Sequence, residues 1–237
     1  MLSVRRVPSL LDLSVALPPF LVDLIPHHLP RLTITHPHKR MAVRLLWMGL
    51  ALLGIAQVQA QARPQIPAPS LHRVPQQINF LPEEFQGTWY VVGLSGNAFR
   101  RANDAQSKMY TTTYELQGDN SYKVTSRLLR GDRCDTFVRT FVQKGQPGQF
   151  TLGNIENYQL QDYLVRVMRT NYNEYALVYF KKTVDGTDYF KITLYGRRED
   201  LRPELKDGFV RLSKSMGLTS DNIIFPAKVE ECIHVQA

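Results

Sequence analysis

The chain of 237 residues contains few of the side chains that most often bind metals or form dense disulfide networks. It has two cysteines, which excludes a disulfide-rich miniature fold and any zinc site with four thiolates. Four of the six histidines precede residue 40, so only His72 and His234 follow. Paired carboxylates, Ser/His/Asp groups and metal-ligand spacings are also missing. The sequence therefore gives no support to a metal centre, a protease or a nuclease.

A hydrophobic run long enough to cross a membrane is missing as well. Such a run needs about 20 apolar residues, and the apolar stretch of this sequence is about a dozen residues long. A shorter apolar stretch, 45–56, follows Arg44 and precedes a small-x-small sequence that ends at Ala60. This order is typical of a secretory signal peptide, which we predict over 41–60 with cleavage after Ala60. The protein is accordingly expected to be secreted and extracellular.

Residues 1–40 are rich in Leu, Pro and His and show no sustained period. We expect them to be an upstream extension or an alternative start, without packed structure. Translation of this segment would place the signal inside the chain and would count against secretion.

The positive charge is concentrated in the segment that cleavage would remove. The whole chain has a net charge of +8, but without residues 1–60 the net charge is +4. The remaining 177 residues contain no Lys/Arg cluster and no RNA-binding motif, so a nucleic-acid partner is not expected. They are numerous enough for one hydrophobic core. The proline-rich residues 61–80 predict an extended N-terminal arm, and 81–237 form the main domain.

The main domain lacks the alternation of strands and helices that a nucleotide-binding sheet requires. It has instead about eight short runs rich in Thr, Tyr, Val and Phe, separated by turn residues such as Asp185-Gly186. This pattern predicts an all-β antiparallel barrel or sandwich. The predicted strands are Thr88–Leu94, Tyr110–Leu116, Tyr122–Arg130, Asp135–Gln143, Gln149–Leu152, Tyr163–Thr170, Tyr175–Lys182 and Tyr189–Tyr195.

One segment has the period of a helix. Within 202–216, apolar residues recur every three or four positions, with Pro203 at the start and Gly217 where a C-terminal cap belongs. The sequence predicts an amphipathic helix here, followed by a short extended piece over 222–225.

The strand 189–195 has one wholly apolar face and one face that carries Tyr, Lys, Thr and Tyr. In an ordinary sheet the apolar face points inward and the polar face meets solvent. A barrel with a helix packed outside inverts this arrangement, so that the polar row lines a cup. The strands 135–143 and 176–182 also place one cation among aromatic residues, Arg139 and Lys182 respectively. Alternation alone leaves both arrangements open.

Cys134 and Cys232 lie 98 positions apart. In a secreted chain two such cysteines are expected to form one disulfide, which here ties the C-terminal tail to a barrel strand. A free nucleophilic or redox thiol is the alternative.

Three short sequences, Gly87-Thr88-Trp89, Thr170-Asn171-Tyr172 and Tyr195-Gly196-Arg197, occur in an order that resembles the lipocalin family. The resemblance implies an eight-stranded antiparallel up-and-down barrel, a calyx, with one C-terminal α-helix packed outside. It also implies that Trp89 plugs the closed end with Arg197 stacked over it, a structural pair.

Longer segments, 82–94, 108–116, 163–182 and 189–201, resemble the siderophore-binding branch of that family. The resemblance implies a non-enzymatic protein that binds ferric catecholate siderophores, keeps iron from bacteria in innate immunity and traffics iron. The ligand's own oxygens would hold the iron, so neither an intrinsic cofactor nor a protein metal site is expected. An endocytic cell-surface receptor is a further expected partner. The implied ligand-binding residues are Arg139, Lys182, Lys191, Tyr110, Thr112, Phe137, Tyr163, Phe180, Tyr189 and Tyr195.

Two positions depart from that branch. Phe137 stands where its human-type member has tryptophan, which weakens the cation–π face of the cup. Gly145 stands where that member has a free cysteine, so a monomer without a covalent link to gelatinase is expected. No N-glycosylation sequon occurs.

Two other functions remain as alternatives. One is a carrier of neutral lipophiles of the retinoid, fatty acid or odorant type. The other is a lipocalin-type prostaglandin isomerase, which requires a free thiol inside the cup.

Overall fold

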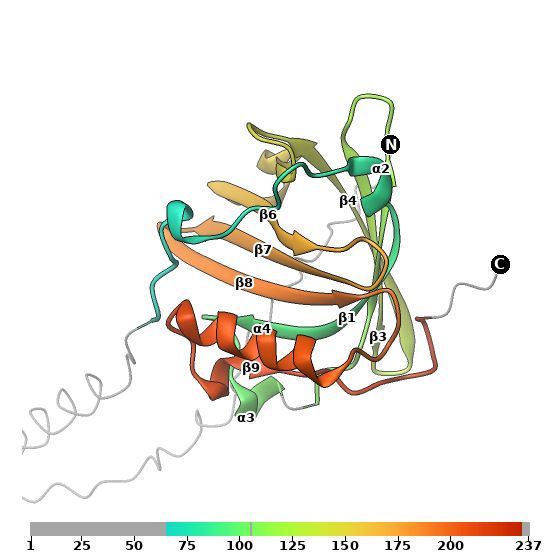
Figure 1. The fold of residues 1–237 in the computed structure, drawn as a ribbon, viewed down its shortest axis with the longest axis vertical. Coiled ribbons are helices and arrows are strands. Elements are labelled where there is room, and N and C mark those ends of the chain that lie inside the picture. Colours follow the sequence, from blue (N-terminus) through green and yellow to red (C-terminus); the bar gives the residue numbers. More distant parts are fainter. Residues whose placement is uncertain (1–64, 105, 234–237) are drawn as a thin grey trace, which may run out of the picture. The chain divides into compact units, whose positions relative to one another are not determined.

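The structure, a computed structural model, describes residues 65–104 and 106–233. Within them, nine strands form one antiparallel sheet, and pairing of β1 with β2 closes the first eight strands into a barrel (Figure 1). The predicted eight-stranded up-and-down barrel is therefore confirmed. The strands are β1 (Gly87–Gly96), β2 (Thr111–Leu116), β3 (Tyr122–Arg130), β4 (Arg133–Gln143), β5 (Gln149–Leu152), β6 (Asp162–Thr170), β7 (Tyr175–Val184), β8 (Thr187–Gly196) and β9 (Ile223–Ile224).

The predicted helix is α4 (Pro203–Ser215), which packs outside the barrel against β1 and β8. Two single-turn helices, α2 (Pro82–Phe85) and α3 (Arg101–Asp104), were not predicted, because four residues are too few to show a period. The 3-10 turns are η1 (Leu71–Arg73), η2 (Ile155–Tyr158) and η3 (Ser220–Asn222). None of the helices in the described ranges has both the length and the apolar character needed to cross a membrane.

The strands β7 and β8 are longer than predicted because their hairpin is tight. Thr187 pairs with Val184, which leaves only Asp185 and Gly186 in the turn. Both have positive φ, 47° and 73°, as a two-residue hairpin turn requires. The extra pairs lengthen the strands at the end of the barrel where the predicted ligand would enter.

The barrel has two hydrophobic clusters, one inside and one outside. The inner cluster includes Trp89, Tyr114, Phe141, Phe180 and Tyr195. The outer cluster joins Phe190, Ile192 and Leu194 of β8 to Phe209 of α4. The apolar face of β8 therefore lies on the outside under the helix, and its polar row points into the barrel. Of the two arrangements that alternation allows, the structure has the inverted one.

Close contact between α4 and β1 requires a glycine. A Cβ at Gly93 would lie 2.9 Å from the Phe209 ring, so a larger residue would push the helix away. Two positions further along β1, Ser95 Oγ and Ser213 Oγ are 2.7 Å apart and satisfy each other inside the contact. The helix is thus seated by both packing and a buried hydrogen bond.

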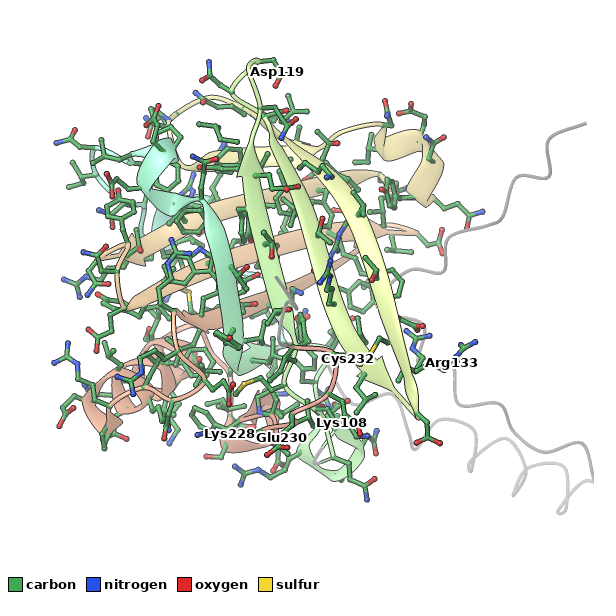
Figure 2. All side chains as sticks on the ribbon, turned by 90° about the vertical axis from the view of Figure 1, so that its right-hand side faces the viewer. Lys108, Asp119, Arg133, Lys228, Glu230 and Cys232 are labelled. Carbon is green, nitrogen blue, oxygen red and sulfur yellow. A yellow bond between two sulfur atoms is a disulfide. The ribbon has the colours of Figure 1, made fainter. Side chains whose placement is uncertain are left out.

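The end of the barrel where β1 begins is closed by Trp89 and Arg197. The Arg197 guanidinium lies 3.6 Å from the centroid of the fully buried Trp89 ring. It also donates to four backbone carbonyls, those of Glu84, Gln86, Thr88 and Tyr172. Figure 2 shows the Asp119 turn at this end of the barrel and Arg133 and Cys232 toward the opposite end. The end away from Trp89 is therefore the one at which a ligand can enter.

The predicted disulfide is present between Cys134 and Cys232, whose Cα atoms are 5.4 Å apart, so neither thiol is free. The described part of the N-terminal arm, 65–80, is interrupted by η1 and runs along the outside of the barrel. Arg166 holds it there by donating to the carbonyls of Leu71 and Val74. The predictions for 1–40 and for the signal peptide 41–60 lie outside the described residues.

A candidate binding site inside the barrel

Three strands each place one cation on the inner face of the barrel. Lys182 of β7 and Lys191 of β8 lie diagonally across one strand pair, because Lys182 is opposite Tyr189 and Lys191 is opposite Phe180. Each ammonium lies over the ring opposite it. Lys191 Nζ is 4.7 Å from the Phe180 centroid, and Lys182 Nζ is 5.6 Å from the Tyr189 centroid. These are cation–π distances.

The third cation, Arg139, comes from β4. It shares a face with Phe137 and Phe141, which are buried, whereas Val138 between them is 52% exposed on the outside. Arg139 Nη2 donates to Ser126 Oγ at 3.1 Å, and Ser126 Oγ lies 3.2 Å from Thr112 Oγ1. Arg139 is thus held by Ser126 of β3, whose hydroxyl is in turn hydrogen-bonded to Thr112 of β2.

The electrostatics show that the three cations converge. The pKa of Lys191 is lowered to about 7, first by burial and then by the positive charges of Arg139 and Lys182. In the described part of the chain no carboxylate forms an ion pair with Arg139 or Lys191. The interior therefore concentrates positive charge that a bound anion would neutralise.

Neutral phenols surround the cations. Burial raises the pKa values of Tyr110, Tyr163 and Tyr195 above the usual value for tyrosine, so their hydroxyls stay protonated at neutral pH. The hydroxyls of Tyr114 and Tyr195 are 3.3 Å apart. Such phenols can donate and accept hydrogen bonds without cancelling the positive charge.

Two buried polar atoms on the inner faces have no hydrogen-bond partner in the described structure, Arg139 Nε and Thr193 Oγ1. Thr193 lies between Lys191 and Tyr195 in the inward row of β8. Buried polar groups are rarely left unsatisfied in a folded protein. Both atoms are therefore available to a polar molecule held inside the barrel.

The structure brings the ten sequence-predicted ligand residues onto one surface, the inner face of the barrel. The register places them on β2, β4, β6, β7 and β8, or directly before β2 for Tyr110. The structural residues Gly87, Trp89 and Arg197 lie at the closed end, and the disulfide lies toward the other. Sequence reasoning missed Ser126 and Tyr114, and it placed Thr193 in the row that could line a cup without naming it as a ligand residue. Alternation along the strand could have found Tyr114, since it shares a face with Tyr110 and Thr112.

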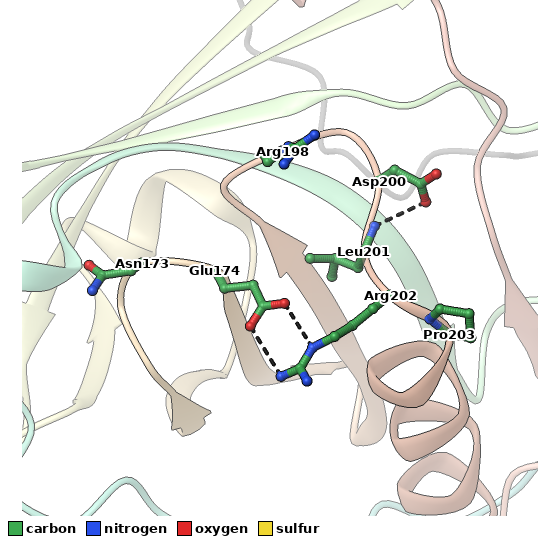
Figure 3. Close-up of a pocket in the computed structure, with 7 residues that line it drawn as sticks. All are labelled: Asn173, Glu174, Arg198, Asp200, Leu201, Arg202 and Pro203. Carbon is green, nitrogen blue, oxygen red and sulfur yellow. Dashed lines mark hydrogen bonds and ion pairs between the residues drawn. The ribbon is translucent and has the colours of Figure 1, made fainter.

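A separate pocket lies outside the barrel, before the first turn of α4 (Figure 3). It contains a bidentate ion pair, in which Arg202 Nε and Nη2 donate to the two carboxylate oxygens of Glu174 at 2.9 and 3.2 Å. This ion pair joins the β6–β7 loop to the start of the helix and is exposed. The pocket contains none of the predicted ligand residues. It is lined by Asn173, Glu174, Arg198, Asp200, Leu201, Arg202 and Pro203.

The known proteins that this chain resembles in sequence include lipocalins. The chain is 55% identical to human neutrophil gelatinase-associated lipocalin over 196 residues, which cover 81% of this chain and 99% of that protein. It is 52% identical to the mouse protein of the same name over 198 residues, with the same coverage. It is also 35% identical to mouse prostaglandin-H2 D-isomerase over 194 residues, 81% of this chain and 98% of that protein.

Among solved structures, the solution NMR structure of lipocalin 12 from rat epididymis matches with a TM-score of 0.60 at 28% identity, over 70% of this chain and 93% of that one. Residues 86–230 match the lipocalin / cytosolic fatty-acid binding protein family. The matched range contains the closed barrel, α4 and every cation of the site. The chain therefore belongs to the lipocalin / cytosolic fatty-acid binding protein family, as a small-molecule-binding lipocalin.

Proposed function

We propose that this protein binds ferric catecholate siderophores inside its barrel and thereby keeps iron from bacteria. The observation that carries the proposal is the convergence of Arg139, Lys182 and Lys191 among aromatic rings on the inner face. Such a site fits a ligand that is multiply anionic, aromatic and flat-faced, as a ferric tris-catecholate is.

The magnitudes favour an anionic aromatic ligand. A cation between catechol rings contributes about 0.5–2 kcal/mol per contact. Each close charge pair adds up to about 4 kcal/mol before desolvation is subtracted, at an effective dielectric near 20. A neutral lipophile would supply neither contribution. It would leave in place both the burial and, after it, the neighbouring positive charges that lower the pKa of Lys191.

The iron itself would be held by the catecholate oxygens. The described residues contain no group of three or more His, Cys, Asp or Glu side chains able to hold a metal ion. The protein's contribution in this proposal is charge, stacking and hydrogen bonds such as those that Arg139 Nε can still make.

We propose a binding protein and not an isomerase. Prostaglandin-H2 D-isomerase is among the relatives, but both cysteines of this chain are joined to each other in the disulfide. No thiol is left inside the barrel for that chemistry.

The test is a titration of the mature chain with ferric enterobactin, iron-free enterobactin and retinol. Because Trp89 is at the closed end, tyrosine fluorescence and the ligand's visible absorbance are followed together with tryptophan fluorescence. We expect one equivalent of ferric enterobactin to bind with submicromolar affinity, and retinol to bind at least about 100-fold more weakly. Tighter binding of retinol would instead establish a carrier of neutral lipophiles.

Secretion is also part of the proposal, with residues 41–60 as the cleaved signal and a monomeric mature chain that a cell-surface receptor takes up. Mass spectrometry of the natural N-terminus tests this. A mature chain that begins at Gln61, cyclised to pyroglutamate, is expected. A chain that begins far upstream would contradict the cleavage site.

A further inference from the structure

We propose that Lys191 is a nucleophilic amine that condenses with aromatic aldehydes carrying an anionic group, forming a reversible imine inside the barrel. This activity is separate from siderophore binding and does not depend on it. It requires only a reachable, uncharged amine beside groups that attract an anionic ring.

Lys191 lies where a molecule inside the barrel can contact both its amine and an apolar ring. The residue lies in the inward row of β8, its side chain is half-buried, and its Nζ is 4.7 Å from the centroid of the Phe180 ring. An aromatic aldehyde that stacks in this space would bring its carbonyl carbon to the amine. Burial inside the barrel removes water from the Lys191 ammonium, and this loss of hydration disfavours its charged form more than the contact with Phe180 favours it.

Among the residues that the structure describes, the charges that act on Lys191 have its own sign. Lys182 faces it from β7 and Arg139 from β4, while the phenols of Tyr163 and Tyr195 are neutral. No ion pair of the described residues includes Lys191. An amine that is desolvated and lies next to other cations loses its proton readily and becomes a nucleophile at neutral pH. This agrees with a pKa of about 7.

Lys181, the residue before Lys182, has charged neighbours of the opposite sign to those of Lys191. Its Nζ lies on the outer face, 3.4 Å from carboxylate oxygens of both Asp162 and Asp188. Lys181 therefore lies in an ion pair with two carboxylates, whereas Lys191 lies among aromatic rings and other cations. The chain therefore contains a matched unreactive lysine on the adjacent strand.

The reaction balances without another reagent. The nitrogen electron pair of Lys191 forms a bond to the aldehyde carbon, and a proton moves from nitrogen to the oxygen to give a carbinolamine. Loss of that hydroxyl with a second proton releases one water and leaves a C=N double bond. The anionic group of the aldehyde would lie against Lys182 and Arg139, which have no role as nucleophiles here but hold the ring in place.

The experiment uses 4-formylbenzoate, an anionic aromatic aldehyde without a catechol, so that it does not report on siderophore chemistry. The full mature protein is incubated with it at pH 7.4, the imine is trapped with cyanoborohydride, and peptide mapping gives the labelling rate of every lysine. We expect Lys191 to be labelled at least about tenfold faster than exposed lysines such as Lys123 and Lys214, because burial and the neighbouring cations favour the neutral form of the Lys191 amine. Equal rates in the wild-type protein would overturn the proposal without any variant.

Two conservative variants sharpen the result. Lys191→Arg keeps the positive charge but cannot form an imine, and should abolish the fast labelling while the urea unfolding curve of the variant shows that the barrel is still folded. Lys181→Arg should leave the fast labelling unchanged. Neutral benzaldehyde should react with Lys191 more slowly than 4-formylbenzoate. Fast labelling that persists in Lys191→Arg would assign the reactive amine to another residue and overturn the proposal.

Discussion

Lys181 and Lys182 are neighbours in the sequence, yet their ammonium groups lie on opposite sides of the barrel wall. Lys181 is outside, paired with Asp162 and Asp188, and Lys182 is inside, over the Tyr189 ring. The two-residue period of β7 produces this separation, since successive side chains of a strand point to opposite faces. One substitution on each side therefore distinguishes a role in binding from a general effect of charge.

Lys182→Ala is expected to weaken ferric enterobactin binding by about 5- to 30-fold, because one cation–π contact and one close charge pair are lost, a combined 1–2 kcal/mol. Lys181→Ala, which removes the same charge from the outer face, should change the affinity less than about twofold. Isothermal titration of both variants at one ionic strength measures this. Equal losses in the two variants would mean that net charge alone, and not the site, controls affinity.

Lys191 should make the unliganded protein less stable at lower pH. Its pKa is lowered to about 7 in the folded protein, below the usual value of about 10.4 for an unfolded lysine, so the unfolded chain binds more protons between these values. The free energy of unfolding therefore rises as pH increases from about 7 toward 10. Lys191→Met removes the buried charge, so we expect the variant to be more stable than the wild type at pH 6.

This advantage of Lys191→Met should shrink as pH rises from 7 to 9.5, where the wild-type amine is neutral in the folded state. Urea unfolding of both proteins at pH 6, 7.5 and 9.5 provides the measurement. A stability difference that stays constant across this range would show that the Lys191 pKa is not lowered.

Much of the fold follows from the sequence because each hairpin has local turn chemistry and each strand has a clear two-residue period. The two-residue period does not determine which face of each strand points into the barrel. The row Phe190, Ile192 and Leu194 looks like the inside of a sheet, and only the packing of α4 over it makes it the outside. The helix lies later in the chain, so this information is non-local.

The family resemblance, more than the two-residue period, predicts the ligand residues. The polar groups that orient them depend on pairing between strands. Ser126 is an ordinary serine in its own strand, and its contact with Arg139 exists because β3 and β4 pair in one register. Likewise, Arg166 looks like an exposed cation in the sequence. In the structure it is 9% exposed and holds the N-terminal arm through backbone carbonyls.

The disulfide should contribute substantially to stability. Cys134→Ser together with Cys232→Ser opens a loop whose ends are 98 residues apart and should lower the free energy of unfolding by about 2–5 kcal/mol. Because the bridge joins the tail to β4 and not to the inner face, ferric enterobactin should bind the folded variant within a few-fold of the wild type. Denaturant unfolding and titration of the double variant test both statements.

Arg197 and Arg198 offer another matched pair, at the closed end. Arg197→Ala removes the cation over Trp89 and the donor to four carbonyls, so we expect a loss of about 2–4 kcal/mol in the free energy of unfolding. Arg197→Lys should not restore it, since one ammonium lacks the planar fork that reaches all these acceptors. Arg198→Ala, at an exposed neighbour, should cost less than about 0.5 kcal/mol. Comparable losses at the two positions would contradict the structural role of Arg197.

Phe137 is the inner-face position where a larger aromatic ring should strengthen binding. It lies on β4 two residues before Arg139, is 8% exposed, and has the Arg130 guanidinium 5.9 Å from its ring centroid. Tryptophan presents a stronger cation–π face than phenylalanine, so Phe137→Trp should tighten ferric enterobactin binding by about two- to fivefold, or about 0.5–1 kcal/mol. The new indole would also report binding directly, because Trp89 lies at the far end of the barrel. Phe137→Leu, which keeps an apolar side chain without the ring, should weaken binding, and an unchanged affinity in both variants would show that this position does not contact the ligand.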